Sequence, residues 1–250
     1  MGAVGAVTER VGVLVHGGDR ALGEALVGAV ATAGALGEVR AVEVTTDRGE
    51  VEVACRRLAE VCTVVIGVGA APWPGWEVWH AAAHDALSQL GDVPYWAVET
   101  WHGLPALHDH LVQAVGERWH DGSRVVVTAP DAALRPLPPE QRVVLRDVAE
   151  ALHAATGTRP TIAVDHSPQE GAVTPMAVTA VTTLAEAHGA DRVVRVSLAP
   201  GDGPDPAVTG AAFTAGVTLS DVTLHRDDQV HLLLEVVATM LRHALSEEAS

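Results

Sequence analysis

A histidine stands directly after a run of apolar residues near the start of the chain, where residues 15–20 read VHGGDR. The two glycines permit a tight turn and a close approach of a ligand, and Asp19 is placed to cap a following helix. A neutral imidazole at such a position can accept a proton or hold a divalent metal near neutral pH. The alternative is that His16 only fills the turn. The segment HGGDRALG lacks the G-x-G-x-x-G spacing of dinucleotide-binding loops.

A second group of candidate residues follows a proline-rich stretch, where residues 75–80 read GWEVWH. Glu77, His80 and His84 are spaced by three and four, so a helix would place them on one face. Oxygen and nitrogen donors of this kind suit a divalent metal of borderline softness. The alternative for the two histidines is a solvated helix face.

Five of the six tryptophans fall within residues 73–101. Aromatic faces beside loops suit a large, flat ligand, although one or two of these side chains must belong to an ordinary core. The residues expected to bind substrate are Gly17, Gly18, Arg20, Trp73, Trp76, Trp79, Trp101 and His102.

Short valine-rich segments alternate with longer segments rich in alanine and leucine, a pattern that predicts βα units around parallel sheets. The expected strands lie near residues 11–15, 39–45, 63–68, 93–98, 124–128, 160–165, 192–198 and 219–224. The expected helices lie near residues 19–34, 50–60, 76–90, 105–119, 138–156, 172–188, 206–215 and 228–245. The pattern repeats after about residue 121, which predicts two tandem flavodoxin-like halves, 1–121 and 122–250, each a four-stranded parallel sheet flanked by helices.

Topology then predicts where a ligand binds, because ligands of open parallel sheets lie beyond the carboxyl ends of the strands, where strand order reverses. With the order 2-1-3-4 in the first half, the loop at His16 faces the loop after Gly67. The second half has Ala129 and Pro130 at the corresponding place, so we expect it to form the opposite wall of a cleft. His166, after its second strand, is expected to be structural.

Composition excludes several classes of function. The formal net charge is −16, and every basic residue is arginine, which argues against a nucleic-acid partner and against Schiff-base or Walker-type lysine chemistry. Cys55 and Cys62 form no metal-binding or disulfide pattern, and no segment predicts a signal peptide or a membrane span. We therefore expect a cytoplasmic monomer or homodimer with no membrane partner.

Several segments together resemble the class II chelatases, specifically the tandem sirohydrochlorin cobaltochelatase or ferrochelatase type of actinobacteria. VHGGDR resembles the H-G-S-R at the first strand of that family, and GWEVWH resembles its G-Y-H-V-R-E. TWHGLPALHDHL resembles the family's P-L-G-x-H-P-x-L, while RVVVTAPDAA and GADRVVRVSLAPGDGPD resemble segments of its second half. Glu77 replaces the second family histidine, Gly18 a serine and Trp79 an arginine, so the chain resembles a divergent member.

The resemblance implies a lyase that inserts Co²⁺, Fe²⁺ or Ni²⁺, as a substrate, into a tetrapyrrole or similar flat chelator, with no organic cofactor. His16 would be the first catalytic residue and base, and Glu77 would take the second proton. The implied metal-binding residues are His16, Glu77, His80 and His84. Arg20 is the arginine placed to meet the carboxylates of such a ligand, which the acidic chain would otherwise repel.

Glu77 leaves the activity open. Protohaem-type ferrochelatases pair a histidine with a glutamate at equivalent places, so His16 and Glu77 resemble a chelatase pair. Alternatively, Glu77 marks a homologue that has left tetrapyrrole chemistry, either a non-catalytic protein that binds a metal or ligand, or a lyase or synthase of a specialised pathway in which His16 is a general base.

Overall fold

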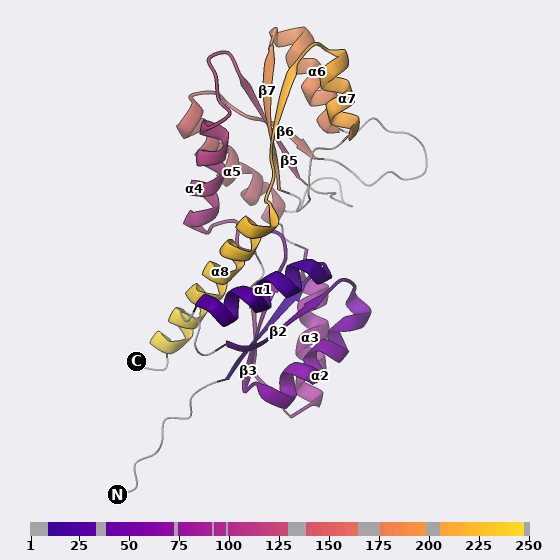
Figure 1. Ribbon diagram of the computed structural model, residues 1–250, viewed down its shortest axis with the longest axis vertical. Helices are drawn as coiled ribbons and strands as arrows, with labels where there is room; N and C mark the ends of the chain where they lie inside the picture. The colour runs from indigo at the N-terminus through magenta and orange to yellow at the C-terminus, as the bar shows by residue number, and fades with distance from the viewer. Residues whose placement is uncertain are drawn as a thin grey trace, which may run out of the picture. The chain divides into compact units, whose positions relative to one another are not determined.

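The chain folds into an α/β structure with two four-stranded parallel sheets, each flanked by helices (Figure 1). The computed structural model describes residues 10–33, 39–72, 75–91, 93–98, 100–129, 139–164, 176–198 and 206–247. The strands of the first sheet are β1 (Val11–His16), β2 (Val39–Thr45), β3 (Val64–Gly69) and β4 (Tyr95–Val98). Those of the second sheet are β5 (Arg124–Ala129), β6 (Thr161–Val164), β7 (Arg192–Ser197) and β8 (Thr218–Val222).

The helices connect these strands in the alternating order expected from the sequence. They are α1 (Arg20–Ala33), α2 (Val51–Val61), α3 (Glu77–Gln89), α4 (Pro105–Gly116), α5 (Pro139–Thr156), α6 (Met176–His188), α7 (Pro206–Thr214) and α8 (Arg226–Glu247), with a short 3-10 helix, η1 (Arg48–Glu50), before α2. Asp19 caps α1 as predicted, because its carboxylate accepts a hydrogen bond from the Leu22 N–H at 2.7 Å.

The first sheet has the strand order β2-β1-β3-β4, so β1 lies between β2 and β3. The register pairs His16, the last residue of β1, with Thr45 of β2 and Gly69 of β3. The backbone at this end is tied on both sides, since the Gly17 N–H donates to the Thr45 carbonyl and the Ala70 N–H donates to the His16 carbonyl, each at 2.8 Å. This is the strand order for which the sequence analysis expects a ligand-binding site next to His16.

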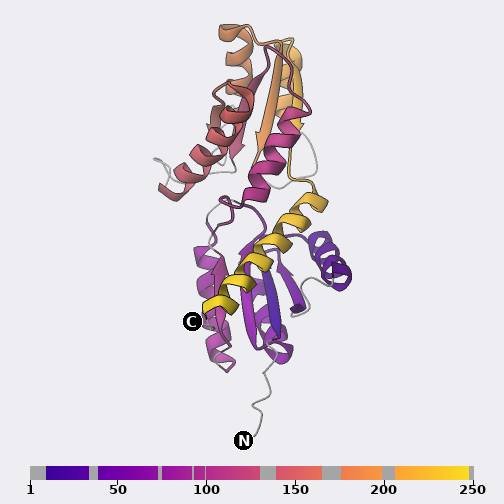
Figure 2. The same ribbon diagram turned by 90° about the vertical axis from the view of Figure 1, so that its left-hand side faces the viewer.

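Alternate residues of β1 face different helices, as the period of two requires. Leu14 packs in a buried cluster with α2 and α3, which includes Leu58 and Leu87. Val13 and Val15 instead lie beside side chains of α1 and α8, among them Leu233. Figure 2 shows α8, in yellow, running across the strands of this sheet. Each face of the first sheet is therefore covered by a pair of helices.

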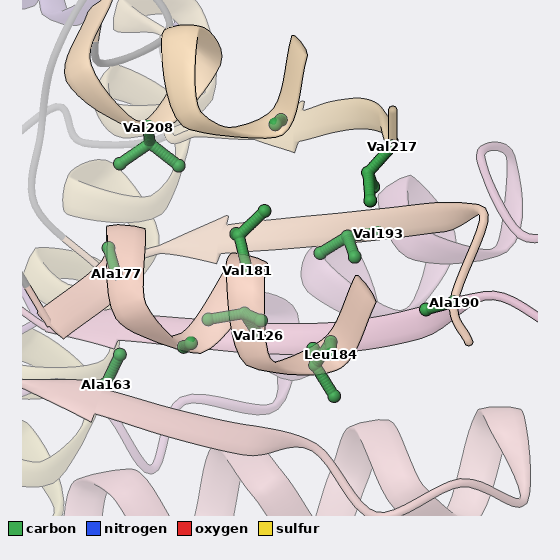
Figure 3. Close-up of a cluster of buried hydrophobic side chains, with 11 residues drawn as sticks. Val126, Ala163, Ala177, Val181, Leu184, Ala190, Val193, Val208 and Val217 are labelled. Carbon is green, nitrogen blue, oxygen red and sulfur yellow. The ribbon is translucent and has the colours of Figure 1, made fainter. Parts of the chain in front are cut away.

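The second sheet has the order β6-β5-β7-β8. Helices α6 and α7 cover one face, where Val126 and Val193 pack with Val181 and Val208 (Figure 3). Helices α4 and α5 pack together, and each also contacts the sheet. A buried ion pair, Arg195 with Asp221, joins β7 to β8.

The chain divides into two compact units, and their composition differs from a simple cut at residue 121. The first unit contains residues 1–70, 74–100 and 229–250, and the second contains 71–73 and 101–228. Each sheet falls in the expected half, but α4 belongs to the second unit and nearly all of α8 to the first. Among the described residues, no helix has the length and apolar composition needed to cross a membrane.

Candidate functional site

His16 lies at the carboxyl end of β1 with its side chain on the same face as Leu14, toward α2 and α3. Its exposed fraction is 0%, which is unusual for an ionisable side chain. Burial, together with the nearby His80, lowers the pKa of His16 to about 3. The imidazole is therefore neutral at physiological pH, and one of its nitrogens has a lone pair.

Three side chains of the first unit form a continuous hydrogen-bonded chain, which we call the His16–Tyr95–His80 chain. The Nε2 atom of His16 lies 3.0 Å from the Tyr95 hydroxyl oxygen, and that oxygen lies 2.6 Å from Nδ1 of His80. Nε2 of His80 lies 3.2 Å from the Val98 carbonyl oxygen. The His16–Tyr95–His80 chain thus begins at His16 of β1, passes through Tyr95 of β4 and His80 of α3, and ends on the backbone carbonyl of Val98 in β4.

Tyr95 is the single tyrosine of the protein, and it lies on the same face of the sheet as His16. Burial, and secondarily the nearby Cys55, raises the pKa of its hydroxyl above the ordinary value. The hydroxyl therefore remains protonated, and it can donate one hydrogen bond while accepting others.

Glycines in β3 make room for this arrangement. A Cβ atom at Gly67 would overlap the Tyr95 hydroxyl, and one at Gly69 would overlap the Trp76 indole. Both positions are on the face of the sheet that holds His16. Two residues without side chains, alternating with apolar residues in a buried strand, therefore create the space for the polar and aromatic side chains.

The Trp76 indole covers the ends of β1 and β3. A Cβ atom at Gly17, which has a left-handed backbone with φ of 73°, would lie 2.5 Å from the indole. Trp79 packs edge-on against Trp76 with ring centroids 6.0 Å apart, and its own ring centroid is 5.6 Å from that of His16. Trp76 and Trp79, two of the four tryptophans expected to bind substrate, thus lie close to His16.

Two buried nitrogen atoms near these strand ends have no hydrogen-bond partner among the described residues: Nδ1 of His16 and Nε1 of Trp76. Unpaired buried polar atoms are costly and mark places where a ligand or water can bind. The Trp76 nitrogen is a donor, and Nδ1 of His16 is an acceptor if the proton of the neutral ring is on Nε2. The two nitrogen atoms can therefore bind a ligand that accepts a hydrogen bond from Trp76 and donates one to His16. They can equally bind a ligand that gives up a proton to His16.

The structure does not bring the four implied metal-binding residues together. His80 is buried and bonded within the chain described above, but Glu77 and His84 are exposed on either side of it. All three residues lie on α3, yet only the central one, His80, is buried. Within the described ranges, no three histidine, cysteine, aspartate or glutamate side chains form a group able to hold a metal ion.

The structure also separates Arg20 and Gly18 from His16. The side chain of Arg20 is 92% exposed, pairs with Glu24, and lines a groove with Val44 on the opposite face of the sheet from His16. Gly18 is explained by packing, since a Cβ atom there would lie 2.6 Å from a methyl carbon of Val44.

The remaining expected substrate-binding residues lie elsewhere. Trp101 and His102 belong to the second unit, where Trp101 is buried and His102 lies 3.5 Å from the Asp147 carboxylate. Burial lowers the pKa of His102, and Asp147 opposes that shift. Trp73, Pro130 and His166 fall outside the described residues.

Tyr95 is the functional candidate that sequence reasoning missed. It is 79 residues from His16, and no spacing rule connects the two. One signal was available: β3 reads VVIGVG, and glycines at alternate positions of a buried strand indicate that something bulky packs against that face.

Comparison with known proteins supports the fold. No protein-family model matches the sequence, and no curated protein matches it. Among solved structures, the chain is similar to CbiX, described as the terminal enzyme for biosynthesis of siroheme in denitrifying bacteria. The TM-score is 0.55 at 13% sequence identity, over 90% of this chain and 98% of CbiX.

Sugar-binding proteins give weaker likenesses. AraP, an arabinose-binding protein from Geobacillus stearothermophilus, has a TM-score of 0.48 at 12% identity, over 85% of this chain and 74% of AraP. A LacI-family transcriptional regulator from Arthrobacter, in complex with lactose, has a TM-score of 0.45 at 15% identity, over 94% of this chain and 91% of the regulator. The fold is thus the two-sheet α/β arrangement of a chelatase such as CbiX, and at this identity the likeness shows the fold alone.

Proposed function

We propose that this protein is a metal chelatase that inserts a divalent metal ion, Co²⁺, Fe²⁺ or Ni²⁺, into a tetrapyrrole or a similar flat chelator. The observation that carries the proposal is the buried, neutral His16 with an unpaired Nδ1 atom at the end of β1. The likeness of the fold to CbiX, an enzyme of siroheme biosynthesis, supports it.

Metal insertion requires an acceptor for protons. Two N–H protons leave the macrocycle when a divalent metal takes their place, and these protons become more acidic as the metal bonds to the ring nitrogens. Because the pKa of His16 is about 3, its lone pair is available throughout the neutral range. His16 takes the first proton at Nδ1 once the metal has made the N–H group acidic, because a base with a pKa of about 3 is weak and also releases the proton readily.

Glu77 is the acceptor of the second proton in this proposal. It stands in the first turn of α3, next to Trp76, and its carboxylate is exposed to water. An exposed carboxylate can pass the proton to solvent directly. The metal reaches the ring as a substrate, and the part of the chain that the structure describes contains no preformed group of metal ligands.

Trp76 must move for the substrate to reach His16, because its indole now covers Gly17 and Gly69. A displaced indole, with Trp79 beside it, offers an aromatic surface on which a flat macrocycle can stack. The net charge of −16 favours a macrocycle with few carboxylates, because like charges repel.

A ligand-binding protein without turnover is the second candidate. The observation that favours it is the contrast between two groups that a chelatase would combine: Glu77 is exposed whereas His16 is fully buried. Such a protein would retain a macrocycle or its metal complex but would not accelerate metal insertion.

The test is metal insertion by the purified full-length protein, followed by the absorbance change of the macrocycle. Co²⁺, Fe²⁺ and Ni²⁺ are each supplied with sirohydrochlorin and with a dicarboxylate porphyrin. We expect insertion above the uncatalysed rate, and a loss on the order of 10²–10⁴-fold in His16→Ala, the usual contribution of a general base.

The matched control is His231→Ala, which removes an exposed histidine from α8. It should leave the insertion rate within about twofold of the wild type, since surface substitutions cost little. Thermal unfolding of both variants checks that they fold. Full turnover by a folded His16→Ala variant contradicts the proposal, and retention of the macrocycle with no insertion by the wild type favours the second candidate.

A further inference from the structure

We propose that Tyr95 and His80 are positioning residues that hold His16 in its Nε2–H tautomer, and so present the Nδ1 lone pair to the reacting proton. The inference deepens the proposed function and rests on it. The geometry that points to it is the His16–Tyr95–His80 chain and its end on a backbone carbonyl.

The Val98 carbonyl at the end of the His16–Tyr95–His80 chain determines the direction of its hydrogen bonds. A carbonyl oxygen only accepts, so Nε2 of His80 carries a proton and donates it to Val98. The buried His80 ring is taken as neutral, so that its other nitrogen has a lone pair. Nδ1 of His80 therefore accepts the hydroxyl proton of Tyr95 across 2.6 Å.

The same reasoning determines which ring nitrogen of His16 carries the proton. The Tyr95 hydroxyl has a single proton, and that proton is already donated to His80. Only lone pairs remain on the Tyr95 oxygen for His16, so Nε2 of His16 is the donor across 3.0 Å. Neutral His16 then has no proton on Nδ1, the buried atom for which the described residues offer no partner.

The residues around the His16–Tyr95–His80 chain hold its three side chains in this geometry. Tyr95 rests over Gly67, where no side chain competes for the space, and burial keeps its hydroxyl protonated. The backbone N–H of His80 donates to the Trp76 carbonyl at 2.9 Å, which fixes the backbone of His80 in the first turn of α3. Isolated imidazole populates both tautomers, so the protein's choice of one requires such partners.

The first measurement reads the tautomer directly, without activity. The ring nitrogens of full-length protein labelled with ¹⁵N-histidine are observed by NMR at neutral pH, and the His16 signals are those lost in His16→Ala. We expect a protonated Nε2 and an unprotonated Nδ1 in the wild type. A His16 protonated at Nδ1 overturns the proposal, whatever the activity.

The second measurement uses Tyr95→Phe, which removes only the hydroxyl oxygen. We expect mixed His16 tautomers and a fall in kcat on the order of 10–100-fold with KM little changed, as for other partners that orient a reacting group. Trp96→Phe on the same strand, whose side chain faces the other side of the sheet, is the control and should change neither the tautomer nor kcat.

A rescue series separates positioning from packing. In His80→Asn the side-chain amide oxygen lies near the former Nδ1 atom and can still accept from Tyr95, whereas His80→Leu cannot. We expect the single tautomer in His80→Asn and its loss in His80→Leu. Equal tautomer populations in the two variants overturn the proposal, and so does an unchanged kcat in Tyr95→Phe. Absence of insertion by a wild type with the expected tautomer overturns the proposed function instead.

Discussion

A buried, neutral histidine makes the stability of the protein depend on pH. The unfolded chain binds a proton at His16 near pH 6.5, but the folded protein binds it only near pH 3. Between these values the unfolded state carries more protons, so stability falls as the pH is lowered. Above about pH 6.5 both states are neutral at this residue, and the effect vanishes.

We therefore predict that the free energy of unfolding falls further in the wild type than in His16→Asn when the pH is lowered from about 7.5 to about 5. The expected difference is about 2 kcal/mol, since each unit of pKa shift is worth about 1.4 kcal/mol. Urea unfolding followed by circular dichroism measures it. Other histidines titrate in both proteins and cancel in the comparison, so parallel pH profiles would contradict the burial of a neutral His16.

The residues of the site illustrate what a sequence can predict at this scale. His16 is predicted as a functional residue because one strand places it at the carboxyl edge of the sheet, where open parallel sheets commonly bind ligands. Its partner Tyr95 is not predicted. The two side chains meet across β3, which lies between β1 and β4, and no sequence spacing reports such a contact. The metal set was inferred from helical spacing, which gives the face of a helix but not which residue of that face enters the core.

At the scale of the elements, the glycines of β3 determine whether the site can form. Gly67 is the one that faces the Tyr95 hydroxyl. We predict that Gly67→Ala lowers the free energy of unfolding by about 1–3 kcal/mol, the usual cost of overpacking a core. It should also displace Tyr95 and produce mixed tautomers at His16, which thermal unfolding and NMR measure together.

A second glycine provides the control. Gly28 is exposed in α1, and apart from its chain neighbours and the adjacent helix backbone no described heavy atom lies within 4 Å of the place that a Cβ atom would take there. Gly28→Ala should raise the free energy of unfolding by up to about 1 kcal/mol, because alanine favours a helix interior. Equal effects of the two substitutions would show that Gly67 makes no room for Tyr95.

The elements themselves were predicted well from the sequence, and the reason is physical. The central strands of the two sheets, β1, β3, β5 and β7, are buried along most of their length, which gives the continuous valine-rich segments that mark buried parallel strands. Helix ends differed by a few residues, as for the helix expected at 105–119 and observed at Pro105–Gly116. Such ends depend on local capping more than on periodicity.

At the scale of the whole molecule, the order of elements does not decide which sheet each helix covers. The repeat in the sequence predicts two equal halves, each ending in its own helix. In the structure α4 packs with α5 in the second unit, whereas α8 from Gln229 onward belongs to the first. Gln229 anchors α8 there by donating a hydrogen bond to the Ala70 carbonyl, just beyond the end of β3.

The last helix should therefore stabilise the first sheet, although it is the most distant element in the sequence. Leu233 of α8 is 1% exposed and lies beside Val13 and Val15 of β1. We predict that Leu233→Ala lowers the stability of the first unit by about 2–5 kcal/mol, the usual cost of removing a buried leucine side chain. Hydrogen exchange read by mass spectrometry should show faster exchange in β1 and β3 and little change in β5 and β7, because local opening follows the unit that loses its contacts.

His231→Ala, at an exposed position of the same helix, is the control and should leave all four strands unchanged. Faster exchange confined to β5 and β7 would mean that α8 belongs with the second sheet, as the division at residue 121 predicts.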